Sequence, residues 1–145
     1  MPTRTARTAW NGTLNEGSGQ VELSSSGAGT FDVSFPQRTA DEAGGTTSPE
    51  ELIAAAHTSC FAMQLSAVIA EAGGTPVALQ VTDEVTLAPD PAGGFRITEV
   101  KVVVRGEVEG LDADGFAQAA QTAKDTCPVS KALAGTTITL DAALD

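Results

Sequence analysis

The chain has 145 residues, 41% of them hydrophobic, and no low-complexity tract, so we expect a single globular domain over residues 1–145. Its 19 acidic and 8 basic residues give a formal net charge of −11, which disfavours nucleic acids and anionic membranes as partners because both would be repelled. Residues 1–12 lack the apolar core of a signal peptide, and no apolar run reaches the about 18 to 20 residues of a membrane span. We therefore expect a cytoplasmic protein with no membrane partner.

The N-terminal part of the chain predicts short antiparallel strands. Residues 4–10 and 19–23 alternate weakly and are separated by turn-forming Asn-Gly and Gly-Ser-Gly sequences. Residues 30–35 alternate more clearly, with three apolar side chains on one face, and we expect Pro36 to end this strand. A polar loop over residues 36–47 follows, in which Arg38 is the only basic residue.

One long helix is predicted over residues 48–73, with Cys60 at its middle. Ser48 is the expected N-cap, Pro49 occupies the first helical position, and Glu51 completes a capping box. Gly73 supplies the left-handed exit at the end. Because apolar side chains leave almost no side of this helix polar, we expect it to be enclosed on most faces.

A polar stripe interrupts the apolar surface of this helix. Glu50, His57, Gln64 and Glu71 recur every seven residues, which is nearly two helical turns, so they share one side. Cys60 lies about 60° around the helix from His57, on the apolar flank of the stripe.

The second half of the chain predicts further strands and a second helix. Residues 77–87 and 95–108 read as a twisted antiparallel pair with a bulge near Glu99, because the apolar parity changes there. A second helix should begin at Asp112 and run to about Asp125, where Cys127-Pro128 interrupts it. Pro128 then opens a short helical turn, and residues 136–144 form a last strand. The order of elements predicts an α+β fold.

The two cysteines carry most of the chemistry that the sequence suggests. In a reducing compartment, two thiols 67 positions apart are expected to be free, catalytic or transiently bridged. Cys60 taken alone reads as a small buried apolar residue. Cys127 is a candidate N-cap, where backbone N–H groups favour the thiolate, and Lys131 lies one turn on. A reactive thiol with a second thiol nearby is the minimum apparatus for reversible oxidation through sulfenic acid to a disulfide.

Other readings of the same residues stay open at this point. His57 and Cys60 are three positions apart, as two zinc ligands on a helix would be, or as the pair of a Cys-His hydrolase. No C-x-x-C or H-x-x-x-H motif supports zinc, and a single histidine is more often a hydrogen-bonded structural residue. A binding or stress-related structural protein with idle cysteines is a third reading.

Glu50 and Arg38 are the remaining candidates for the site. Glu50 precedes Cys60 by ten residues, about 15 Å along a continuous helix, so it cannot touch that sulfur directly. It could serve the same site through a bridging residue such as Arg38, or from a second copy of the helix in a dimer. Arg38 by itself also reads as a solvated loop residue.

Two long motifs resemble those of the osmotically inducible protein C (OsmC) family, which is related to the organic hydroperoxide resistance (Ohr) proteins. They are S-P-E-E-L-I-A-A-A-H-T-S-C-F-A-M at residues 48–63 and T-C-P-V-S-K-A-L at residues 126–133. The A-A-A-H-T-S-C form is more similar to the OsmC branch than to the Ohr branch. The order of elements extends the resemblance over nearly the whole chain.

The resemblance implies an OsmC-like α+β fold, in which a long central helix and a second helix pack on antiparallel sheets of an intertwined homodimer. It also implies a thiol-dependent peroxidase for organic hydroperoxides, with hydrogen peroxide as a second substrate. Cys60 then matches the peroxidatic cysteine, Cys127 the resolving cysteine, and Arg38 with Glu50 the activating pair. No metal, haem or flavin is implied.

The implied cycle acts in oxidative and osmotic stress defence. Arg38, held by Glu50, would favour the Cys60 thiolate, which attacks the peroxide and becomes a sulfenic acid. Cys127 would condense with it, and an external dithiol such as a lipoylated protein or a small thiol would reopen the disulfide. Phe61, Leu52 and Met63 are candidates to contact the organic part of the peroxide.

Overall fold

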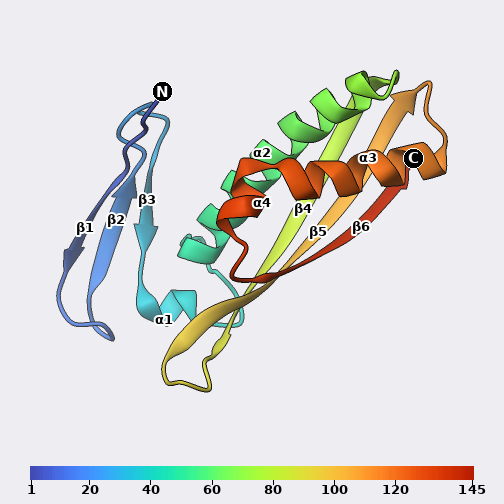
Figure 1. Cartoon of the computed structure of the whole chain (residues 1–145). Helices are drawn as coiled ribbons and strands as arrows, with labels where there is room; N and C mark the ends of the chain where they lie inside the picture. Colours follow the sequence, from blue (N-terminus) through green and yellow to red (C-terminus); the bar gives the residue numbers. More distant parts are fainter. The chain divides into compact units, whose positions relative to one another are not determined.

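The computed structural model describes residues 1–145, and the chain divides into two compact units (Figure 1). The N-terminal unit is Met1–Leu52 and the C-terminal unit is Ile53–Asp145. The elements in chain order are β1 (Arg7–Asn11), β2 (Ser18–Glu22), β3 (Thr30–Val33), α1 (Phe35–Arg38), α2 (Pro49–Glu71), β4 (Thr75–Pro89), β5 (Phe95–Glu109), α3 (Ala113–Thr126), α4 (Pro128–Ala132) and β6 (Thr137–Leu144). Helix α2 begins in the N-terminal unit and continues in the C-terminal one.

The N-terminal unit is a three-stranded antiparallel sheet in the order β1-β2-β3. Trp10 on β1 pairs with Gly19 on β2, and Val21 on β2 pairs with Phe31 on β3. The first turn requires Gly12, whose φ of 95° is left-handed backbone that other residues resist. The predicted strands and their antiparallel pairing are confirmed.

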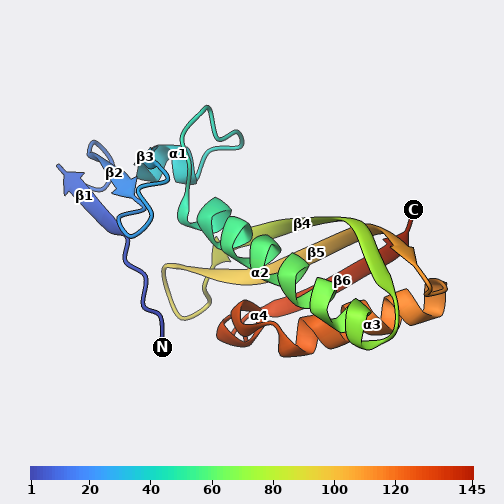
Figure 2. The ribbon, with the colours of Figure 1, turned by 90° about the horizontal axis from the view of Figure 1, so that it is seen from above.

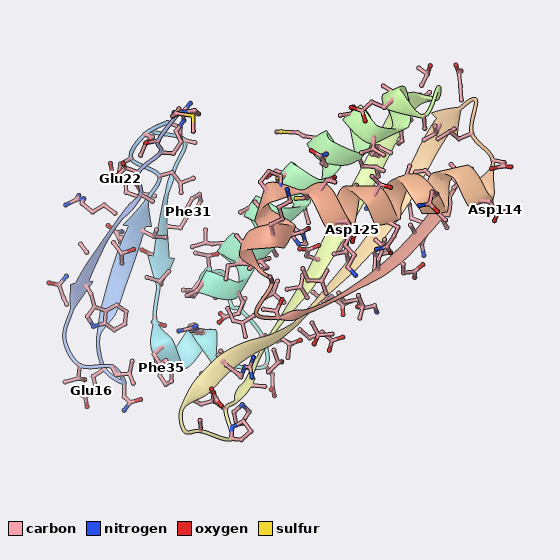
Figure 3. All side chains as sticks on the ribbon, in the orientation of Figure 1. Glu16, Glu22, Phe31, Phe35, Asp114 and Asp125 are labelled. Carbon is pink, nitrogen blue, oxygen red and sulfur yellow. The ribbon has the colours of Figure 1, made fainter.

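The chain leaves this sheet earlier than expected. Strand β3 ends at Val33, and the next residues form the short helix α1 (Figure 3 labels Phe31 and Phe35). Ser34 caps α1 by accepting a hydrogen bond from the Gln37 N–H at 3.3 Å. Pro36 lies in the first turn, where the missing N–H of proline costs no helical hydrogen bond. The expectation that Pro36 ends a strand and opens a loop was wrong, although the cap and the proline were both readable.

Helix α2 begins as predicted but uses its capping glutamate differently. The Glu51 N–H donates to Ser48 Oγ at 3.2 Å, which is the N-cap bond. The Glu51 carboxylate accepts from the hydroxyl of Thr47 at 2.5 Å, rather than reaching back to the Ser48 N–H. The carboxylate therefore ties the helix start to the preceding segment.

The C-terminal unit contains the second sheet, in the order β4-β5-β6. Strands β4 and β5 form the predicted long antiparallel pair. Thr86 pairs with Glu99 while the adjacent Leu87 pairs with Ile97, so Thr98 is an extra residue on β5. The predicted bulge near Glu99 is thus confirmed.

The last strand differs from the expectation of antiparallel sheets in one respect, since β6 pairs with β5 in parallel. Val102 lies opposite Leu140 in this pairing. The two helices between these strands carry the chain back to the end at which β5 began, which is what a parallel neighbour requires. The α+β class is confirmed, with a mixed second sheet.

The two C-terminal helices follow their predicted caps. Asp112 Oδ1 accepts from the Gly115 N–H at 2.8 Å and starts α3. Cys127 ends α3 in extended conformation, with φ −61° and ψ 124°, and is at the same time the N-cap of α4, which Pro128 opens. The two helices therefore join at the second cysteine.

Helices α2 and α3 lie on the same face of the β4-β5-β6 sheet in both views (Figures 1 and 2). The core between them is made of apolar side chains from α2, β5 and α3. Its largest fully buried members are Phe61, Leu65, Ile69, Val100, Val102, Val104 and Phe116.

The expectation that α2 is enclosed on most faces does not hold within one chain. Met63, at its centre, is 73% exposed, and several neighbouring alanines are exposed as well. The helix also has the length and composition of a membrane span, with mean hydropathy 1.6 over 18 residues, which corrects the expectation that no run qualifies. Core helices of soluble proteins pass the same test, and α2 supplies Phe61, Leu65 and Ile69 to the core.

Candidate active site

The fold brings the two cysteines together. Their sulfur atoms lie 3.2 Å apart although the residues are 67 positions apart in the chain. Cys60 comes from the middle of α2, and Cys127 from the junction of α3 and α4. Both are free thiols, Cys127 fully buried and Cys60 partly exposed. One partly accessible sulfur therefore faces one protected sulfur.

The surroundings separate the two thiols in acidity. Burial raises the pKa of Cys60 above its ordinary value of 9.0; a backbone hydrogen bond at Val129 opposes this, and Cys127 raises it further. Burial also acts to raise the pKa of Cys127, but hydrogen bonds from the Ser130 N–H, the Cys60 thiol, the Ser130 hydroxyl and the Val129 N–H together lower it. Cys127 is therefore the more acidic thiol of the reduced pair. Its S–H donates to Cys60 Sγ at 3.2 Å in the neutral pair, and Cys60 becomes the donor when Cys127 ionises.

Arg38 and Glu50 form an ion pair within the N-terminal unit. Arg38 Nη2 lies 2.7 Å from Glu50 Oε1, and Arg38 Nε donates to the two carboxylate oxygens at 3.0 and 3.2 Å. Glu50 is buried, and the Arg38 side chain is 30% exposed. Helix α1 ends on Arg38, so the unpredicted helix is what delivers the guanidinium to the carboxylate. Of the four candidate residues, the structure thus assembles one pair in each unit.

A second polar group, which sequence reasoning missed, lies beside the cysteines. His57 is fully buried; its Nδ1 is 2.5 Å from Asp83 Oδ2 and its Nε2 is 2.7 Å from Ser130 Oγ. Asp83 sits on the buried parity of β4 with Leu79, Val81 and Val85, and this parity was a readable signal for a carboxylate in the core. Ser130 is the third residue of α4, inside the second motif.

Three of the four residues of the polar stripe on α2, Glu50, His57 and Gln64, bond to protein, whereas Glu71 is exposed. One heptad after His57, Gln64 Nε2 donates to Thr126 Oγ1 at 2.9 Å, just before Cys127. Two members of the stripe thus bond to the segment from Thr126 to Ser130. These bonds fix the junction of α3 and α4 against the helix that carries Cys60.

Comparison with known proteins decides the family. A model of the "OsmC-like protein" family matches residues 41–141, which include three of the four candidate residues and parts of both units. The chain belongs to the OsmC-like protein family. Peroxiredoxin OsmC of Escherichia coli is 41% identical over 132 residues, which cover 91% of this chain and 90% of that protein.

Solved structures of relatives support the same family and the fold. An organic hydroperoxide resistance protein OsmC from Legionella pneumophila matches with 26% identity and a TM-score of 0.77, covering 99% of each chain. The organic hydroperoxide resistance protein OhrB of Bacillus subtilis matches with 28% identity and a TM-score of 0.74, covering 95% of this chain and 97% of that one. The OsmC-like fold expected from the two motifs is confirmed.

The three apolar residues expected to contact a substrate differ in exposure. Phe61 is fully buried in the core, Leu52 is half-buried, and Met63 projects from α2 with 73% exposure. An apolar pocket of about 280 Å³ lies in the N-terminal unit, next to Arg38. Its other lining residues are Trp10, Leu14, Val33, Ser34, Phe35 and Pro49.

The alternative hypothesis of a zinc site is not supported by a set of ligands in this OsmC-like chain. No group of three or more His, Cys, Asp and Glu side chains is arranged to hold a metal ion. Both ring nitrogens of His57 are occupied, by Asp83 and by Ser130. His57 and Cys60 therefore have different partners rather than a shared ion.

Proposed function

We propose that Cys60 and Cys127 are the peroxidatic and resolving cysteines of a cysteine-based peroxidase that acts on organic hydroperoxides in stress defence. The chain is a thiol-dependent oxidoreductase of the OsmC-like family, and its relatives are named as a peroxiredoxin and as hydroperoxide resistance proteins. The observation that carries the proposal is the distance of 3.2 Å between the two sulfurs.

In the first step, the Cys60 thiolate attacks the terminal oxygen of the hydroperoxide. The O–O bond breaks, an alcohol leaves after taking up a proton, and Cys60 becomes a sulfenic acid. Cys60 suits this role because it is the more accessible of the two sulfurs. The proton of Cys60 leaves to solvent, which reaches this partly exposed residue, and the alkoxide takes up a solvent proton.

In the second step, Cys127 attacks the sulfenic sulfur of Cys60 and expels water, so that a disulfide forms. The sulfurs need to approach by about 1 Å to reach the disulfide bond length of about 2.05 Å. An external dithiol, such as a lipoylated protein or a small thiol, then reduces the disulfide by exchange. No bound cofactor or metal is part of this cycle.

Arg38 and Glu50 are proposed as the activating pair on the strength of the family motifs and of their ion pair. Because burial raises the pKa of Cys60, that thiol needs a positive partner to ionise and react at neutral pH. A guanidinium supplies this charge and also stabilises the oxygen that becomes negative as the O–O bond breaks. Glu50 holds the planar fork of Arg38 through its two oxygens.

The apolar pocket beside Arg38 is proposed to take the organic part of the hydroperoxide. Its side chains are mainly apolar, and the guanidinium at its edge suits the peroxide oxygens. This assignment replaces the expected contacts with Phe61 and Met63. Hydrogen peroxide has no organic part and would gain nothing from the pocket.

A homodimer is proposed because each unit leaves apolar surface uncovered. Met63 on α2 is 73% exposed, and Trp10, Leu14 and Phe31 of the N-terminal unit are between 40% and 57% exposed. Three short strands with so little buried apolar surface are marginal alone, so a covering partner is expected. We propose that this partner is a second copy of the chain and that residues 1–145 of each copy act as one domain. The proposed location is the cytoplasm, which keeps thiols reduced.

Intact mass spectrometry tests the proposal directly. One equivalent of cumene hydroperoxide should remove two hydrogens from the reduced protein, and peptide mapping should join Cys60 to Cys127. Dithiothreitol should restore the original mass. Unchanged mass after treatment, or cysteines oxidised independently to sulfinic acids, would contradict the proposed cycle.

A further inference from the structure

The group of Asp83, His57 and Ser130 has no role in the cycle described so far. His57 is the single histidine of the chain, is fully buried, and bonds to Asp83 on one ring nitrogen and to Ser130 on the other. Asp83 Oδ1 is also buried and has no hydrogen-bond partner, an arrangement that costs stability. A carboxylate kept in the interior with half of its acceptors unused calls for a reason beyond packing.

Asp83, His57 and Ser130 are hydrogen-bonded in the same order as the Asp-His-Ser triad of a serine hydrolase. The burial of the group excludes attack by Ser130 on a substrate. A serine nucleophile must reach a substrate carbonyl, whereas Ser130 is 5% exposed and His57 has no exposed surface. Cys127, the N-cap of α4, lies three residues before Ser130, and the Ser130 hydroxyl is a hydrogen-bond partner of its sulfur. The group is therefore placed to act on the cysteine rather than on a substrate.

We infer that Asp83, His57 and Ser130 form a buried proton relay that takes the proton of Cys127 and so prepares this cysteine to attack oxidised Cys60. The inference rests on the proposed function and adds three residues to it. Ser130 contacts the reacting sulfur, while His57 and Asp83 act through Ser130 and are positioning residues. The Ser130 hydroxyl is one of the groups that lower the pKa of Cys127.

Hydrogen-bond donors and acceptors balance in both states of the relay. In the neutral state, the Ser130 hydroxyl donates to His57 Nε2, and His57 Nδ1–H donates to Asp83. The proposed transfer begins when the Cys127 S–H, which donates to Cys60 Sγ at 3.2 Å, turns to Ser130 Oγ. When the Cys127 proton moves to Ser130 Oγ, the former hydroxyl proton moves to His57 Nε2. The serine hydroxyl then donates to the thiolate, and the imidazolium donates at both nitrogens.

This transfer leaves the net charge of the interior unchanged. A thiolate and an imidazolium replace two neutral groups, and the Asp83 carboxylate stabilises the new positive charge. The titratable groups around His57 are Asp83 from β4 and, through Ser130, Cys127 and its neighbour Cys60. No proton has to travel to solvent, which matters because Cys127 is fully buried.

The stored proton completes the second step of the cycle. The thiolate of Cys127 attacks the sulfenic sulfur, the S–S bond forms, and the S–O bond breaks with its electron pair on oxygen. The departing hydroxide takes up the proton that the relay accepted and leaves as water. His57 returns to its neutral state, and no further oxidant or reductant is needed.

Single-turnover kinetics test the relay. Ser130→Ala and Asp83→Asn should leave the peroxide-dependent oxidation of Cys60 within about twofold of wild type and slow disulfide formation by about tenfold or more. In these variants, the rate of disulfide formation should rise with pH as an unassisted thiol ionises, whereas the wild-type rate should stay flat around neutrality. Ser130→Thr keeps the hydroxyl and should restore the wild-type rate and pH profile.

Thr136→Val is a matched control for these variants. It removes a half-buried hydroxyl that donates to Leu133 O at 2.8 Å near the end of α4 and has no hydrogen bond to either sulfur. It should leave both steps unchanged. Wild-type rates and pH profiles in Ser130→Ala and Asp83→Asn would overturn the relay.

Imidazole ¹⁵N NMR tests the relay without any turnover, because one histidine gives one set of signals. The Nε2 signal of His57 should differ between the reduced wild type and Cys127→Ser, because only the wild-type thiol passes a proton to this nitrogen. Identical ring signals in both proteins would overturn the relay. If wild type formed no disulfide, the proposed function would fail, and the NMR comparison would still decide whether the relay exists.

Discussion

The sulfur atoms of Cys60 and Cys127 lie 3.2 Å apart without a disulfide between them. Cys60 is fixed on a long helix. Cys127 sits where α3 meets α4; its N–H donates to Ala123 O at 2.8 Å and its C=O accepts from the Lys131 N–H at 3.0 Å, so both helices hold its backbone. Bonds from Ser130 and Thr126 to α2 hold this junction in place, so a small movement of the two side chains has to close the last distance.

The first prediction separates the roles of the two cysteines. Cys60→Ser should abolish consumption of cumene hydroperoxide, because the attacking sulfur is gone. Cys127→Ser should still reduce one equivalent and then accumulate a Cys60 sulfenic acid, which dimedone traps and mass spectrometry locates. Undiminished peroxide consumption by Cys60→Ser would remove Cys60 from the reaction.

The second prediction concerns the pH dependence of the thiol pair. Thiolate absorbance should rise in two steps, one below and one above the ordinary pKa of 9.0, because the pKa of Cys127 is lowered and that of Cys60 is raised. Cys60→Ala should move the lower step to higher pH, since Cys127 loses a hydrogen-bond donor. Cys127→Ser should move the upper step to lower pH, since Cys60 loses a neighbouring negative charge. A single step near 9.0 in wild type would contradict the assignment.

The pair also makes stability depend on pH in opposite senses. The lowered pKa of Cys127 favours the folded state increasingly as pH rises past that pKa toward 9.0, and this contribution is lost as pH falls through it. The raised pKa of Cys60 disfavours the folded state once pH exceeds 9.0. Urea unfolding of the reduced protein should therefore show lower stability above pH 9.0 than in Cys60→Ser.

The third prediction tests the ion pair of Arg38 and Glu50. Arg38→Ala should raise the pKa of Cys60 and slow its first oxidation by about 10²-fold or more, because both the thiolate and the developing oxyanion lose a positive charge. Arg38→Lys keeps the charge but not the planar fork, so it should recover only part of the rate. The reference is Arg7→Ala, which breaks the exposed ion pair with Glu22 and should have no effect. Equal rates in all three variants would exclude Arg38 from the site.

The fourth prediction concerns the apolar pocket. Leu14→Ala should raise KM for cumene hydroperoxide by about three- to tenfold, as expected for the loss of a few buried carbons, and leave the rate with hydrogen peroxide unchanged. Trp10 is the only tryptophan and lines the same pocket, so its fluorescence should change when cumyl alcohol binds. Val77→Ala, at another exposed apolar residue, serves as the control. Equal losses of activity with cumene hydroperoxide and hydrogen peroxide would show that the pocket does not bind the organic group.

The fifth prediction tests the second copy. Met63→Glu places a charge on the uncovered face of α2 and should convert a dimer into a monomer, as measured by light scattering after size exclusion. Gln118→Glu adds the same charge on the exposed side of α3 and should leave the mass unchanged. A wild-type protein that runs as a monomer would contradict the proposed dimer.

Local sequence determined most of the elements because their signals are local. Ser48 and Asp112 cap their helices, and Pro128 starts α4, through contacts within a few residues. The change of apolar parity near Glu99 was enough to predict the bulge at Thr98. Helix α1 was missed because an alternating pattern that ran on to Phe35 outweighed the cap at Ser34.

By itself, the sequence determined that this is an α+β chain of the OsmC-like family with two thiols, because motifs and caps depend on neighbours in the chain. Only the tertiary structure decided which thiol is the more acidic, since burial and hydrogen bonds come from segments far apart. It also decided that β6 runs parallel to β5 and that Asp83, 26 residues after His57, turns its carboxylate toward that ring. Long-range pairings of this kind follow from how the helices pack on the sheet, and no short stretch of residues encodes that packing.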